Sequence, residues 1–130
     1  MPRPKHPHPT PGELEVLQIL WDAGPATVRD VLDVLQANER GRAYTSVMSL
    51  LNVMAEKGLV KRTPQGRAFL YVPVMKKDAA LGRMVRDLCR RAFEGSASTL
   101  VTRLLDETNP SDAELKAIRD AIRDYERRQP

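Results

Sequence analysis

The sequence predicts a mainly α-helical chain of the α+β class, in which one short β-hairpin interrupts a series of helices. Three observations lead to this prediction. Apolar residues recur at helical spacing in six segments, two strand-like runs flank a turn in the middle of the chain, and Gly, Pro, Ser or Thr stand at the breaks. A chain of 130 residues is long enough for one compact domain or for two small ones that share a helix.

The central stretch, residues 43–73, begins as a helix with two different faces. Its apolar residues fall at i, i+3, i+4 and i+7, which makes one stripe: Val47, Leu50, Leu51 and Met54. The other side carries short polar side chains without a long charged one: Thr45, Ser46, Ser49 and Asn52. Gly58 follows Lys57 as a helix stop signal, so we expect the helix to end there.

Two strand-like runs follow this helix, Leu59–Arg62 and Ala68–Val72, separated by the turn-forming residues 63–67. A polar-faced helix followed by a hairpin with a basic tip is typical of a winged helix-turn-helix, whose recognition helix enters the major groove of DNA. Phe69 and Tyr71 lie on the same face of a period-two strand, and we expect both in the core rather than stacked on bases.

The charge of this region favours an anionic partner. The whole chain has a net charge of +4 and a pI near 9.5, which is only a weak signal. Residues 40–67, however, contain a single acid, Glu56, and six basic residues: Arg40, Arg42, Lys57, Lys61, Arg62 and Arg67. Phosphate contacts need such an imbalance.

Two shorter helices precede the central stretch. Thr10 and Glu13 form a capping-box pattern, and the helix should run to about Asp22 with four residues inward: Leu14, Leu17, Leu20 and Trp21. Thr27 and Asp30 begin a second helix, which should end near Ala37 with four buried residues: Val28, Val31, Leu32 and Leu35. Residues 1–9, which hold four prolines, should be a disordered arm, so that the winged-helix domain covers residues 10–75.

Residues 76–130 predict three amphipathic helices, capped by Asp78, by Ser96 and by Ser111 in a capping box with Glu114. Three such helices cannot enclose much apolar surface alone, so they either fold back on the first domain or pair with a second copy. We favour pairing, because a two-fold dimer reads two DNA half-sites. The expected dimerisation residues are Leu81, Met84, Val85, Leu88, Phe93, Leu100, Leu104, Leu105, Leu115, Ile118 and Ile122.

Other classes of function lack their residues. A single cysteine, Cys89, allows neither an internal disulfide nor a cysteine-rich metal cage, and there is no catalytic Ser/His/Asp or Cys/His set or phosphate-binding glycine loop. We therefore expect no enzymatic activity, no cofactor and no metal. No apolar run is long enough to cross a membrane, and the N-terminus has no secretion signal, so we expect a cytoplasmic protein without membrane insertion.

Several blocks resemble the penicillinase repressor family, which includes regulators of β-lactamase and methicillin resistance and copper-responsive proteins. The resemblance spans about Thr10 to Leu115 and lies in residues 13–21, 27–31, 43–49, 57–60 and 66–73. It implies a dimeric winged-helix repressor on a palindromic double-stranded DNA operator, with base-reading positions at Thr45, Ser46 and Ser49 and a phosphate contact from Arg67. With the charge pattern, the full expected DNA-binding set is Arg42, Tyr44, Thr45, Ser46, Ser49, Asn52, Arg62 and Arg67.

The resemblance also shows departures. Relatives often place an arginine late on the recognition helix where this chain has Val53, which removes a strong guanine contact. Copper-responsive members carry a C-terminal Cys-x-Cys that is absent here. Other members resemble targets of a membrane sensor metalloprotease; the corresponding residues 90–94 lack the usual asparagine. The alternative function is a protein-interaction module on a winged-helix fold, for which the basic charge of residues 40–67 would be unnecessary.

Overall fold

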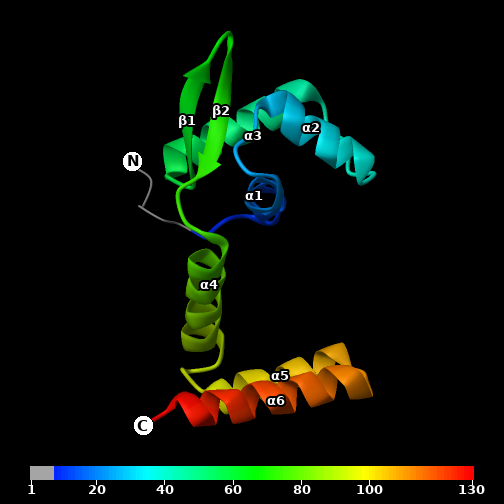
Figure 1. Cartoon of the computed structure of the whole chain (residues 1–130), viewed down its shortest axis with the longest axis vertical. Helices are drawn as coiled ribbons and strands as arrows, with labels where there is room; N and C mark the ends of the chain where they lie inside the picture. The colour runs from blue at the N-terminus through cyan, green and yellow to red at the C-terminus, as the bar shows by residue number, and fades with distance from the viewer. Residues whose placement is uncertain (1–7) are drawn as a thin grey trace. The chain divides into compact units, whose positions relative to one another are not determined.

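A computed structural model describes residues 8–130 of the chain (Figure 1). The chain divides into two compact units, of which the first ends at Met84 and the second comprises Val85–Pro130. The expected disordered arm, residues 1–9, lies outside the described residues except for His8 and Pro9. No helix within residues 8–130 is both long and apolar enough to pass through a membrane.

The first unit has the predicted order of three helices and a hairpin (Figure 1). The helices are α1 (Pro11–Ala23), α2 (Val28–Ala37) and α3 (Tyr44–Lys57), and the strands are β1 (Val60–Gln65) and β2 (Ala68–Pro73). The expected capping box of Thr10 with Glu13 is present, and Thr27, the expected N-cap of α2, forms another capping box with Asp30. Gly58 ends α3 at a φ of 82°, a left-handed conformation that glycine adopts without strain.

The core of this unit is formed by all three helices and both strands. It consists of Val16, Leu17, Ile19, Leu20, Ala26, Val28, Val31, Leu32, Leu35, Val47, Leu51, Met54, Val60 and Tyr71. The expected core of α2 is confirmed, whereas that of α1 was partly wrong. Leu14 and Trp21 are only half-buried, and Val16 and Ile19 are buried instead. The reason is that α1 packs against α2, α3 and β2 together, so it buries a wider arc than one stripe.

The two strands pair antiparallel and are longer than expected, with Arg62 opposite Tyr71 and Pro64 opposite Phe69. Proline is tolerated in β1 because this two-stranded sheet has only edge strands. Tyr71 is buried at 1% exposure, as expected, but Phe69 is 42% exposed, so its assignment to the core was wrong. Burial is confined to the end of the hairpin away from the turn, and Phe69 lies close to the turn.

The hairpin is attached to the helices by a backbone bridge between Ala26 and Tyr71. The Ala26 N–H donates to the Tyr71 carbonyl at 3.1 Å, and the Tyr71 N–H donates back at 2.8 Å. Ala26 belongs to the connection between α1 and α2, so an isolated β-bridge joins this connection to β2. These two hydrogen bonds therefore fix the base of the hairpin to the connection between α1 and α2.

The remaining helices are α4 (Lys77–Ala92), α5 (Ala97–Thr108) and α6 (Asp112–Arg128), and the boundary between the units falls inside α4. Ser96 and Ser111 cap α5 and α6 as expected, but the predicted capping box of Ser111 with Glu114 is only half formed: the Ser111 hydroxyl accepts the Glu114 N–H at 3.2 Å, and the Glu114 side chain does not accept the Ser111 N–H in return. Asp78 does not cap α4: the Ala80 N–H donates to the Lys76 carbonyl, so the helix begins at Lys77 and Asp78 lies in its first turn.

The second unit, all of whose residues are described, buries no side chain completely. Its large apolar residues that are at least 39% exposed are Val85, Leu88, Val101, Leu104, Ile122 and Tyr125. Several neighbours on the same helices, such as Leu100 and Ile118, are only half-buried. A 46-residue unit without a buried residue has apolar surface that the chain itself does not cover.

Candidate nucleic-acid interface

One face of α3 is held toward solvent by the burial of the opposite face. Val47, Leu51 and Met54 are each 0% exposed, which fixes the rotation of the helix about its axis. The polar side is exposed over the first two turns: Tyr44, Thr45, Ser46, Met48 and Ser49. The hydroxyl groups of Thr45, Ser46 and Ser49 make no hydrogen bond to any other residue of the range 8–130. They can both donate to and accept from base edges, which is what direct readout in a major groove requires.

The hairpin beside α3 carries the available positive charge. Lys61, Arg62 and Arg67 are exposed, and none of them pairs with a carboxylate among the described residues. Arg67 directly follows Gly66 in the turn, where Gly66 has a φ of 61°. Cations that have no carboxylate partner on a projecting hairpin are able to contact phosphates.

The other three basic residues of the 40–67 window face acids of α1. Lys57 lies 2.7 Å from Glu13, Arg40 lies 2.8 Å from Glu15, and Arg42 lies 4.0 Å from the other oxygen of Glu15. The window therefore overstates the free charge, since the neutralising acids lie upstream of it in sequence. Of these three, Arg42 keeps the loosest ion pair and its side chain is 40% exposed, so it stays a predicted DNA contact at the start of α3.

A cleft of about 290 Å³ separates α3 from the hairpin. It is lined by Thr27, Val28, Arg29, Tyr44, Met48, Asn52, Arg62, Arg67, Ala68, Phe69 and Tyr71, which include three arginines and no acid. Of the three, Arg29 has an exposed partner in Asp33 at 3.5 Å. Five of the eight predicted DNA-binding residues lie on α3, and four of the eight line this cleft: Tyr44 and Asn52 on α3, and Arg62 and Arg67 on the hairpin. The base-reading candidates Thr45, Ser46 and Ser49 lie on α3 but are not among the residues that line the cleft.

A hydrogen-bond network inside this cleft was not expected from the sequence. The side-chain oxygen of Asn52 accepts from Arg62 at 3.0 Å and from the Tyr71 hydroxyl at 3.2 Å, while the Arg62 guanidinium lies 4.8 Å from the centre of the Phe69 ring. Arg62 and Tyr71 are opposite each other in the sheet, a pairing that depends on the strand register. No local sequence pattern gives that register together with the position of α3.

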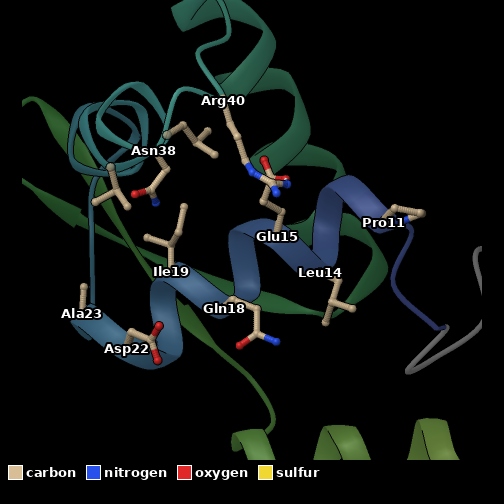
Figure 2. Close-up of a pocket in the computed structure, with 11 residues that line it drawn as sticks. Pro11, Leu14, Glu15, Gln18, Ile19, Asp22, Ala23, Asn38 and Arg40 are labelled. Carbon is tan, nitrogen blue, oxygen red and sulfur yellow. The ribbon is translucent and has the colours of Figure 1, made fainter. Parts of the chain in front are cut away.

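A larger groove of about 480 Å³ lies between α1 and α2 (Figure 2). Figure 2 shows Arg40 and Glu15 pointing toward one another at one side of it, and Asp22 at the other end of α1. Its charged lining thus includes two carboxylates and one guanidinium. A nucleic acid would meet net negative charge there, so we take the exposed face of α3 with the adjoining hairpin, and not the larger groove, as the candidate nucleic-acid interface.

Three helices followed by a hairpin, with an exposed polar face on the third helix, define a winged helix-turn-helix protein. Comparisons with known proteins agree with this class. The chain matches the penicillinase repressor family over residues 9–124, and it therefore belongs to the penicillinase repressor family. It is 34% identical to the transcriptional regulator BlaI of Mycobacterium tuberculosis over 119 residues, which cover 88% of this chain and 84% of that protein.

More distant relatives extend the same likeness. The penicillinase repressor of Bacillus licheniformis is 20% identical over 124 residues, covering 95% of this chain and 96% of that protein. The solution structure of the DNA-binding domain of the repressor BlaI superposes with a TM-score of 0.50 and 23% identity, over 56% of this chain and 88% of that domain. That likeness supports the winged-helix fold of the first unit.

Proposed function

We propose that this protein acts as a homodimeric transcriptional repressor on a palindromic double-stranded DNA operator. Membership of the penicillinase repressor family makes it a DNA-binding repressor; the homodimer and the palindrome are our proposal. The observation that carries the proposal is the uncharged, exposed hydroxyl face of α3 beside the unpaired cations of the hairpin. This arrangement separates base reading from backbone contact, as sequence-specific binding requires.

The residues divide between these two roles. We assign base reading to Thr45, Ser46 and Ser49, because their exposed hydroxyls on the first two turns of α3 make no hydrogen bond within residues 8–130. We assign phosphate contacts to Arg62 and Arg67, because they are exposed and form no ion pair with a carboxylate within residues 8–130. Arg42 and Tyr44, at the beginning of α3, would meet the edge of the same groove. We assign no catalytic role to any of these residues.

Dimerisation is supported by the uncovered apolar side chains of the second unit. Leu88, Leu104 and Ile122 are each at least half exposed, and a second copy of the same surface would cover them. Two joined copies would present two α3 helices to two half-sites, which raises both affinity and specificity. We therefore propose the second unit, with the end of α4, as the dimerisation region.

Other members of the family resemble targets of a membrane sensor metalloprotease. If this protein is released from DNA by such proteolysis, we propose that the cut falls at the end of α4. Residues 90–94 run from the last turn of α4 into a bend at Glu94 and Gly95, both of which have positive φ. Arg90, Arg91, Ala92 and Glu94 are exposed. A membrane sensor metalloprotease is the candidate partner for such a cut, and coexpression with a neighbouring metalloprotease gene, followed by mass spectrometry of the fragments, tests it.

The experiment that tests the DNA-binding proposal is selection of bound duplexes from a random library by the full-length protein. The selected duplex should contain inverted half-sites and bind more tightly than a scrambled duplex of the same composition. Binding should weaken steeply with salt, because phosphate contacts release counterions. Failure to enrich any sequence would count against a repressor, and salt-insensitive capture of a protein partner instead would favour an interaction module.

A further inference from the structure

Asn52 stands between the recognition helix and the hairpin and is hydrogen-bonded to both strands. Its Oδ1 atom accepts from Nη1 of Arg62 in β1 at 3.0 Å and from the hydroxyl of Tyr71 in β2 at 3.2 Å. Asn52 itself is half-buried on α3, one turn after the exposed Ser49. A single acceptor on α3 therefore receives donors from both strands of the hairpin.

The chemistry of these donors fixes the orientation of the Asn52 amide. A guanidinium can only donate, so the oxygen of Asn52, and not its nitrogen, must face Arg62. The Tyr71 residue is only 1% exposed, and its buried hydroxyl needs the same oxygen as its partner. An asparagine that reads adenine uses its oxygen and its nitrogen together on one base edge. With the oxygen engaged twice inside the protein, Asn52 is not available for that contact.

Arg62 is held from a second direction as well. Its guanidinium carbon lies 4.8 Å from the centre of the Phe69 ring, within the range of a cation–π interaction. Phe69 is 42% exposed near the turn, so this contact with Arg62 lies at the solvent-facing end of the hairpin. Arg62 forms no ion pair with a carboxylate among residues 8–130, so its charge can interact with an external anion.

We propose that Asn52 is a positioning residue, which orients Arg62 toward one DNA backbone phosphate at the cleft between α3 and the hairpin. This inference rests on the proposed function, because the anion is a phosphate of the bound duplex. Asn52 acts through Arg62 in two ways. It reduces the conformational freedom that Arg62 would lose on binding, and it links the position of the hairpin to that of α3. The predicted direct DNA contact by Asn52 is thereby replaced with an indirect role.

The test measures the affinity of full-length variants for the duplex selected by the wild-type protein and for its scrambled counterpart, by fluorescence anisotropy at several salt concentrations. Asn52→Ala should weaken binding to both duplexes by the same factor, about two- to tenfold, as expected for one side chain that must now be immobilised on binding. The slope of affinity against salt should stay unchanged, because Arg62 retains its charge. Arg62→Ala should reduce the magnitude of that slope by about one, which corresponds to the loss of one phosphate contact.

The double variant distinguishes a positioning role from an independent one. In the Arg62→Ala background, the further change Asn52→Ala should alter affinity by less than about twofold, since residues that act through one another are not additive. Ser49→Ala, one turn earlier on α3, is the matched control and should have the same effect in both backgrounds. Tyr71→Phe removes the donor on β2, so thermal unfolding of this variant measures what the hydrogen bond between Tyr71 and Asn52 contributes to stability.

Three results would overturn the proposal: wild-type affinity in Asn52→Ala, a changed preference for the selected duplex over the scrambled one, or an undiminished effect in the Arg62→Ala background. Each of these results is interpreted on the condition that the wild-type protein binds the selected duplex more tightly than the scrambled one. A wild-type protein that binds both duplexes equally would instead contradict the proposed function itself.

Discussion

The ammonium group of Lys57, at the end of α3, lies 2.7 Å from Oε1 of Glu13, in the first turn of α1. Glu13 is 2% exposed and is the one buried charged residue of the described core. The same oxygen accepts the Thr10 N–H at 2.9 Å, so the carboxylate is both ion-paired and part of the helix cap. This pair joins the beginning of α1 to the end of α3, and α3 carries the base-reading face.

Removing the cation of this pair should destabilise the first unit. Lys57→Met keeps the aliphatic length of the side chain but leaves a buried carboxylate without its partner. We expect a loss of about 3 kcal/mol in the free energy of unfolding, the low end for a buried pair because the Lys57 side chain keeps some solvent exposure. Urea denaturation measures it. Lys61→Met, an exposed and unpaired lysine on the hairpin, is the matched control and should stay within about 0.5 kcal/mol of wild type.

The same pair predicts a dependence of stability on pH. Burial raises the pKa of Glu13, but the hydrogen bonds from Lys57 and Thr10 outweigh it and hold the pKa below its ordinary value of 4.5. The folded state therefore binds this proton less readily than the unfolded state. Its contribution to stability is present above the unfolded pKa and is lost as the pH falls through the folded one. Glu13→Gln should lack this component, so the stability difference between wild type and variant should shrink between about pH 5 and pH 3. A constant difference would contradict it.

Arg67→Ala tests the phosphate role of the hairpin tip. Arg67 is exposed in the turn and unpaired within the described residues, so its loss should weaken specific and scrambled duplexes alike. We expect about 1 kcal/mol, roughly fivefold, and a salt slope that is lower by about one. Anisotropy titrations at several salt concentrations measure both. Loss of binding to the specific duplex alone would show that Arg67 reads bases instead.

Ser49→Ala tests the base-reading role of α3. The hydroxyl is exposed and has no partner within residues 8–130, so its removal should cost the fold little. It should reduce specific binding by about 1 kcal/mol or less and change the preferred base at one position of each half-site. Repeating the library selection with the variant measures the preference directly. An unchanged selected sequence would remove Ser49 from the reading set.

Local signals were sufficient to predict the order of the elements and most of their ends. Thr10 with Glu13, Thr27 with Asp30, and Gly58 all act within one turn, so their neighbours in sequence determine their roles. The burial of Glu13 could not be foreseen in the same way. Its capping role was evident, but its ionic partner is 44 residues away, and only the packing of α1 on α3 brings them together.

In the candidate site, too, local sequence predicts some features, while others depend on how distant segments pack. The exposed hydroxyl face of α3 followed from helical spacing, because the stripe of Val47, Leu51 and Met54 fixes which side is buried. The network around Asn52 depends on which residue of β1 faces which residue of β2 and on where α3 crosses them. Phe69 and Tyr71 share a strand face, yet only Tyr71 lies under the helices. The alternation of residues along a strand predicts which side chains share a face, but it does not predict how much of that face the helices bury.

Dimerisation through the second unit is tested by Ile122→Asp. Ile122 is 53% exposed on α6, and we propose that a second copy covers it. A carboxylate there would be desolvated in the interface at a cost of several kcal/mol, so the variant should be monomeric at micromolar concentration. A monomer presents one recognition helix, so its affinity for a two-half-site duplex should fall by at least about tenfold. Analytical ultracentrifugation and anisotropy measure the two effects.

Ala117→Asp is the matched control for this substitution. It adds the same charge to the same helix, but helical geometry places position 117 about 140° from position 122, away from the apolar stripe of α6. It should leave both the dimer and the affinity for DNA as they are in the wild type. If the wild-type protein were itself monomeric, or if Ile122→Asp remained a dimer, the apolar side chains of the second unit would have to be covered by something other than this surface of a second copy. The two effects must also appear together, because the proposed gain in affinity comes from joining two α3 helices and not from any contact that Ile122 makes with DNA.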